Sequence, residues 1–148
     1  MGLFKFIKDA GEKLFGASPS AAATPEALQQ EVAKHGLQAQ GLQVSVEGDK
    51  VKVSGNAMST ADAEKIILAL GNTQGVAEVQ SDLIVNKETP PSNMYTVAKG
   101  DTLWAIAEKE YGKGKGAHYT EIFEANKPML THPDKIYPGQ VLRIPPLA

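Results

Sequence analysis

The spacing of hydrophobic and polar residues changes several times along the chain, and each change predicts a different element. In residues 1–15 the apolar positions fall on one face of a helix, and most charged residues lie opposite. The positions on that face are Leu3, Phe4, Ile7, Gly11, Leu14 and Phe15. We expect an N-terminal amphipathic helix that packs on the following domain, with a helix on a membrane surface as the alternative. Residues 16–24, GASPSAAAT, are typical of a flexible connector.

Residues 25–86 have the pattern of a domain, which begins with a helix and a β-hairpin. Pro25 suits the first position of a helix, and Gly36 suits its end. Apolar residues then alternate with polar ones on both sides of EGDK at 47–50. This alternation predicts two strands joined by a tight turn.

The same domain is expected to continue with a second helix and a third strand. Ser59 and Asp62 resemble a capping box, with Asp in place of Glu. An apolar stripe at helical spacing follows, and Gly71-Asn72 is a helix stop signal. Alternation over 79–85 predicts the last strand, so the expected order is α-β-β-α-β. Residues 87–93 contain two adjacent prolines and are expected to form a short, stiff linker.

Residues 94–148 predict the order strand, helix, helix, strand. Asp101 can cap a helix that Gly112 ends. A second helix is expected near 120–126, and the Pro-Gly pair at 138–139 fits the centre of a type II turn before the last strand. The whole chain is therefore expected to be an α+β protein with two small domains.

Composition narrows the classes of function. The net charge of −2 offers no basic footprint for nucleic acid, and the absence of cysteine excludes disulfides and thiolate metal sites. No run of apolar residues approaches the length of a membrane span. Lys5, Lys8 and Asp9 interrupt the region where a signal peptide needs an apolar core. We therefore expect a cytoplasmic protein, with a monomer as the default.

The side chains do not form a recognisable catalytic set, so we expect a protein that is not an enzyme. The histidines, His35, His118 and His132, lack metalloprotease spacing, and no GxSxG, P-loop or GxGxxG motif occurs. Trp104 and the tyrosines can stack on sugar rings, but a core role is favoured for most of them.

Backbone carbonyls remain as candidate ligands. The helix that ends at Gly71 leaves carbonyls with partial negative charge at the loop GNTQGV, residues 71–76. Neutral carbonyl dipoles suit a large monovalent cation, whereas calcium or magnesium prefers carboxylates, which this loop lacks. An ordinary helix end and turn is the alternative.

Three stretches carry resemblances to known families. VEGDKVKVSGNAMS at 46–59 and GNTQGVAEVQSDLIV at 71–85 resemble a BON domain. YTVAKGDTL, FEANK and IYPGQVLRIP, in this order between 95 and 145, resemble a LysM domain. With MGLFKFIKDAGEKLF in front, the whole chain is similar to a family of small bacterial potassium-binding proteins.

The resemblance to that family implies K+ as the bound ion and main-chain oxygens as its ligands. The positions that carry over are the carbonyls of Ile7, Ala10, Gly71, Thr73 and Val76, with a sixth ligand left unassigned. It also implies that the LysM domain supports the bound form, so that K+ favours a compact arrangement of the two domains.

Two other functions stay open at the level of sequence. A LysM groove around 100–103 and 127–136 would bind the N-acetylglucosamine chains of peptidoglycan. A phospholipid surface, contacted through the BON domain and the first helix, is a third possibility. Fold analogy alone supports the glycan reading, and a fold does not fix a function.

Overall fold

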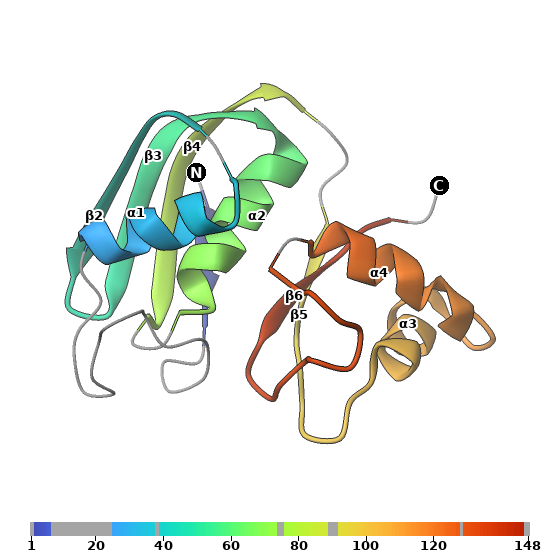
Figure 1. The fold of residues 1–148 in the computed structure, drawn as a ribbon. Helices are drawn as coiled ribbons and strands as arrows, with labels where there is room; N and C mark the ends of the chain where they lie inside the picture. Colours follow the sequence, from blue (N-terminus) through green and yellow to red (C-terminus); the bar gives the residue numbers. More distant parts are fainter. Residues whose placement is uncertain are drawn as a thin grey trace.

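The computed structural model describes residues 2–6, 25–37, 39–73, 76–88, 92–127 and 129–146. These residues form two lobes, and helices and sheets occur in both, as expected for an α+β protein (Figure 1). The N-terminal lobe runs through β1 (Gly2–Lys5), α1 (Pro25–Lys34), β2 (Ala39–Glu47), β3 (Lys50–Ser59), α2 (Thr60–Gly71) and β4 (Glu78–Lys87). The C-terminal lobe contains β5 (Asn93–Thr96), α3 (Leu103–Tyr111), the 3-10 helix η1 (Gly116–His118), α4 (Tyr119–Ala125) and β6 (Val141–Ile144).

The four strands of the N-terminal lobe form one sheet in the order β1-β4-β3-β2. Strands β3 and β4 are parallel and α2 connects them, whereas the other two pairs are antiparallel. Both helices cover the same face of this sheet (Figure 1), and the core between them is apolar. Its most buried large members are Leu28, Val32, Val51, Val53, Ile66, Leu70 and Val76. This core fixes the end of α2 against the sheet.

The expected N-terminal helix is wrong over residues 2–5, which form strand β1. Phe4 and Phe6 pack against the core while Leu3 and Lys5 are exposed, so the side chains alternate with the period of a strand. The edge of β4 offers unpaired backbone groups, and pairing with them satisfies the backbone of residues 2–5. The predicted helical positions from Ile7 onward lie outside the described residues, as does the connector at 16–24.

The hairpin and the second helix of this lobe confirm the local signals. Strands β2 and β3 pair with Glu47 opposite Lys50, and Gly48 has a φ of 65°, which residues with a side chain rarely adopt. The Ser59 hydroxyl oxygen accepts a hydrogen bond from the Asp62 N–H at 3.1 Å and caps α2. Helix α2 then runs to Gly71, where the sequence placed its end.

The C-terminal lobe packs two helices against a two-stranded sheet, with β5 antiparallel to β6. Gly112, with a φ of 118°, ends α3 as predicted. Gly139 has a φ of 89°, and the Gln140 N–H donates to the Tyr137 carbonyl, which confirms the turn before β6. Leu103, Ile106, Ile122 and Leu142 are among the residues of its separate core.

The expected cap of α3 is off by one residue. Thr102, not Asp101, is the N-cap, because its hydroxyl oxygen accepts a hydrogen bond from the Ala105 N–H at 3.1 Å. The Asp101 carboxylate accepts from the Ala98 N–H and the Tyr95 hydroxyl instead. A carboxylate just before a helix can therefore close the preceding turn rather than cap the helix.

Candidate metal site

The candidate site starts at the carboxyl end of α2, where a helix leaves carbonyls without partners inside the helix. The Asn72 N–H donates to the Leu68 carbonyl, and the Thr73 N–H donates to the Leu70 carbonyl. The Val76 N–H then donates to the Thr73 carbonyl at 3.2 Å. A carbonyl oxygen has two lone pairs and can accept more than one partner.

The side chains of two candidate ligands anchor this loop in the interior. Thr73 and Val76 are 1% and 0% exposed. The Thr73 hydroxyl donates to the Ala69 carbonyl at 2.9 Å, so its polar group is satisfied although it is buried. The two described ends of the loop are therefore fixed in the interior of the lobe.

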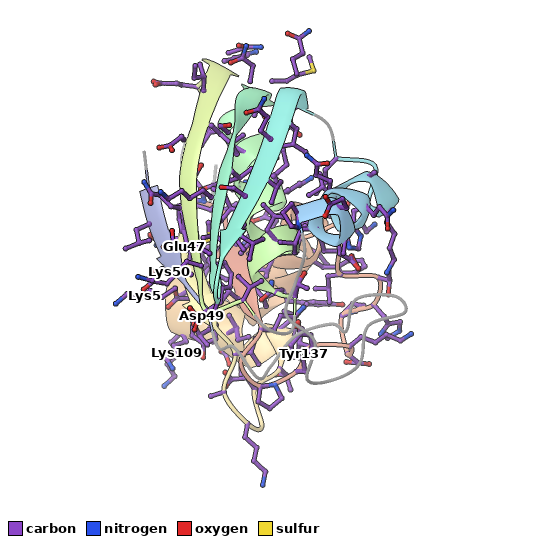
Figure 2. All side chains as sticks on the ribbon, turned by 90° about the vertical axis from the view of Figure 1, so that its left-hand side faces the viewer. Lys5, Glu47, Asp49, Lys50, Lys109 and Tyr137 are labelled. Atoms are coloured by element: carbon purple, nitrogen blue, oxygen red, sulfur yellow. The ribbon has the colours of Figure 1, made fainter. Side chains whose placement is uncertain are left out.

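The segment after the loop is tied to the β2–β3 turn. The Asp49 carbonyl accepts hydrogen bonds from the N–H groups of Ala77 and Glu78, at 2.8 and 3.3 Å. Figure 2 labels Asp49 at this end of the sheet, close to Glu47 and Lys50. These bonds fix the chain where it leaves the loop and enters β4.

The N-terminal segment reaches the same place from the other direction. Lys5 pairs with Glu78, and the Phe6 N–H donates to the Ala77 carbonyl at 2.8 Å. The tip of the Phe6 ring occupies the position that a Cβ on Gly71 would take. Phe6 therefore lies beside the end of α2. Ile7 and Ala10 lie outside the described residues, so their carbonyls stay a prediction.

The C-terminal lobe contacts the same helix end through Asn72, which stands between two candidate ligands. Its side-chain amide donates to the Val141 carbonyl at 2.8 Å, and its side-chain oxygen accepts from the Val141 N–H at 2.9 Å. The Tyr137 hydroxyl lies 3.5 Å from the Asn72 carbonyl oxygen. The Asn72 side chain thereby bonds both backbone groups of Val141 at the start of β6 and links the two lobes.

A buried ion pair makes a second contact between α2 and β6. The Arg143 Nε and Nη2 atoms each lie 3.1 Å from Glu64 Oε1, and both side chains are buried. Glu64 Oε2 accepts from the Ser92 N–H, and Arg143 Nη1 donates to the Ala125 carbonyl. Burial and then the charge of Arg143 lower the pKa of Lys65, the neighbour of Glu64 on α2. The two lobes are thus joined by specific polar contacts.

The sequence missed the contact of Phe6 with Gly71 and the contact of Asn72 with the C-terminal lobe. The alternation of Phe4 and Phe6 was a signal for a strand, but Leu3 and Phe4 also fit the spacing of a helical face. Asn72 was recognised only as a helix stop, because the partner of an amide cannot be read from local spacing.

Most of the aromatic residues considered for sugar binding pack against the core of the C-terminal lobe, as expected, whereas Trp104 is exposed. Tyr95, Tyr111 and Tyr119 pack against its core, which confirms a core role for them. Trp104 is 51% exposed and lies against Gly116, with its ring centroid 6.1 Å from that of Tyr119. Burial raises the pKa of Tyr111 to about 12, and its hydroxyl donates to the Pro145 carbonyl.

The described residues bear on metal binding by side chains and on membrane spanning. Within that part of the chain, His, Asp and Glu side chains do not gather in a group of three or more that could hold a metal ion. In the same residues, every helix is too short or too polar to cross a bilayer.

Comparison with known proteins defines the class and then the family. Residues 20–87 match the BON domain family, and residues 95–145 match the LysM domain family, neither of which is enzymatic. The chain is thus a BON–LysM protein. It is 44% identical to "Potassium binding protein Kbp" of Escherichia coli O6:H1, over 98% of this chain and 99% of that protein, and it belongs to the same family. An uncharacterized protein of Deinococcus radiodurans is 40% identical over 53% of this chain and 28% of its own length.

Proposed function

We propose that this protein binds K+ through backbone carbonyls at the junction of its N-terminal segment and the loop 71–76. The observation that supports this most directly is that the Phe6 ring contacts Gly71 while the Phe6 N–H donates to the Ala77 carbonyl. It brings a segment from the start of the chain to a helix end some 65 residues later. The relative named as a potassium binding protein matches over nearly the whole length.

The ligands in this proposal are the carbonyls of Ile7, Ala10, Gly71, Thr73 and Val76. Neutral carbonyls can replace the weakly held hydration shell of K+. Mg2+ dehydrates reluctantly, and Ca2+ prefers carboxylates, so such a cage disfavours both. A cage too wide to contract around Na+ would add selectivity among monovalent ions.

The wider role that we propose is that of a cytoplasmic, monomeric K+ sensor. Bound K+ would favour the arrangement in which the BON and LysM domains are in fixed contact, because the loop that holds the ion also carries Asn72. The shift cannot exceed the difference in the ion's affinity for the two arrangements.

Calorimetric titration of the full chain tests the proposal. KCl, NaCl and an N-acetylglucosamine oligomer are added in separate runs at constant ionic strength. We expect saturable binding of K+, weaker binding of Na+, and the same K+ affinity at pH 6 and pH 8, because carbonyl oxygens do not titrate there. Small-angle scattering should show a smaller radius of gyration with K+. Sugar binding without K+ binding would favour the peptidoglycan function.

A further inference from the structure

The contact between Phe6 and Gly71 has a geometry that only glycine allows. Gly71 is the last residue of α2 and is absent from the described glycines with positive φ, so its backbone conformation does not require glycine. Glycine is nevertheless unfavourable in a helix compared with alanine. The tip of the Phe6 ring fills the space where that Cβ would stand. The lack of a side chain on Gly71 thus leaves room for the Phe6 ring.

Strand β1 has few other means of fixing its position. It has four residues, lies at the edge of the sheet and pairs only with β4. Short edge segments open more readily than central strands. Of its side chains, Leu3 and Lys5 are exposed, whereas Phe4 packs on the core of the lobe. Phe6, which follows the strand, contacts the last residue of α2.

We infer that Phe6 is a positioning residue of the ion site. Its ring, seated on Gly71, sets the register of the N-terminal segment against the loop 71–76, so that ion binding is coupled to the pairing of β1 with β4. This inference rests on the proposed K+ function. It adds that the site exists only when β1 is paired, and that Gly71 serves the ring as well as supplying a carbonyl.

The coupling has two measurable consequences. If K+ binds only the paired form, the apparent affinity equals the affinity of that form multiplied by the fraction of molecules in which β1 is paired. Linkage then requires that K+ favour pairing to the same extent. The Phe6 N–H, which donates to the Ala77 carbonyl, should therefore exchange with solvent more slowly when K+ is present.

A double-mutant cycle tests the inference by calorimetric K+ titration of the full chain. Phe6→Ala removes the ring, and Gly71→Ala places a methyl group where the ring lies. We expect each variant to bind K+ about tenfold more weakly, as it would if only a tenth of the molecules kept β1 paired. Because both changes break one contact, the double variant should bind no more weakly than the weaker single variant.

Leu3→Ala is the matched control, since Leu3 lies on β1, three residues before Phe6, but is 58% exposed. It should leave K+ affinity within about twofold of the wild type, as expected for a surface change. Circular dichroism checks that each variant folds, and exchange of the Phe6 N–H without K+ reports β1 pairing independently. Gly71→Ala should accelerate that exchange.

The outcomes separate this inference from the proposed function. Wild-type protein without K+ binding would overturn both. Wild-type binding together with Phe6→Ala or Gly71→Ala variants of unchanged affinity would overturn only the positioning role. The positioning role would also be overturned if the losses of K+ affinity in the two single variants multiplied in the double variant, because the two residues would then act independently.

Discussion

The carboxylate of Asp101 closes the loop that joins β5 to α3. It accepts a hydrogen bond from the Tyr95 hydroxyl at 2.7 Å and another from the Ala98 N–H at 2.8 Å. Both bonds lower the pKa of Asp101 below its ordinary value, and the bond from Tyr95 has the larger effect. The bond to Asp101 also raises the pKa of Tyr95. This part of the LysM domain is thus most stable when Asp101 is ionised and Tyr95 is protonated.

At the residue scale, we predict that the Tyr95→Phe variant loses stability in a pH-dependent way. At pH 7 its free energy of unfolding should be lower by about 1 kcal/mol, the usual value of one hydrogen bond. A lowered folded pKa contributes stability above the unfolded pKa, so the difference should shrink as the pH falls below about 4. Urea unfolding at several pH values measures it. In an Asp101→Ala background, Tyr95→Phe should cost clearly less, because only the 3.4 Å bond from Lys109 Nζ to the Tyr95 hydroxyl is then lost, and an equal cost there would refute the pairing.

Strand β1 pairs with β4 through its backbone, and side chains of alternating charge stand at facing positions across the sheet. Lys5 is opposite Glu78, Glu78 is opposite Lys50, and Lys50 is opposite Glu47. Figure 2 labels Lys5, Lys50 and Glu47 close together at one end of this sheet. Opposite charges on facing positions of neighbouring strands stabilise pairing modestly. This row favours the register that brings Phe6 to Gly71.

At the scale of elements, we predict that Lys5→Glu weakens the pairing of β1. A second acid opposite Glu78 replaces attraction with repulsion, which costs up to about 1 kcal/mol at such a position. The Phe6 N–H should exchange faster, and the effect should shrink in concentrated NaCl because residue 5 is exposed and Glu78 is only half-buried. Lys52→Glu is the control, since Lys52 faces Gln80 and Ser45. Equal exchange in both variants would argue against the charge row.

Helix α2 joins the two domains of the molecule. Near its middle Glu64 pairs with Arg143, and at its end Asn72 bonds the backbone of Val141. Two of the candidate ion ligands flank Asn72. A movement of β6 relative to α2 would therefore move the backbone of the proposed site, which gives the LysM domain a physical route to affect it.

At the scale of the whole molecule, we predict a strong effect of Arg143→Met. It leaves Glu64 buried without its partner, and breaking such a pair costs about 3–5 kcal/mol. Chemical denaturation followed by tryptophan fluorescence, which reports the LysM domain through Trp104, measures the loss. The Glu64→Met/Arg143→Met double variant should recover much of it, because both charges are then gone. A double variant as unstable as Arg143→Met would contradict this account.

Sequence reasoning was accurate where the signals are local. The Ser59–Asp62 cap, the hairpin turn at Gly48 and the end of α3 at Gly112 each depend on residues a few positions apart. It failed for residues 2–5, whose apolar spacing fits both a helix and a strand. It could only propose the ion ligands by family resemblance, because every residue has a carbonyl and none is distinctive in sequence.

The sequence by itself determined the identity and order of most elements, since caps, turns and periodicity act within one or two turns of chain. Only the tertiary structure decided that the edge of β4 makes residues 2–5 a strand, and that Phe6 fills the place of a side chain on Gly71. It likewise decided that Asn72 and Glu64 meet β6, at separations of 69 and 79 residues. Such contacts depend on how the elements pack together, and no local pattern encodes them.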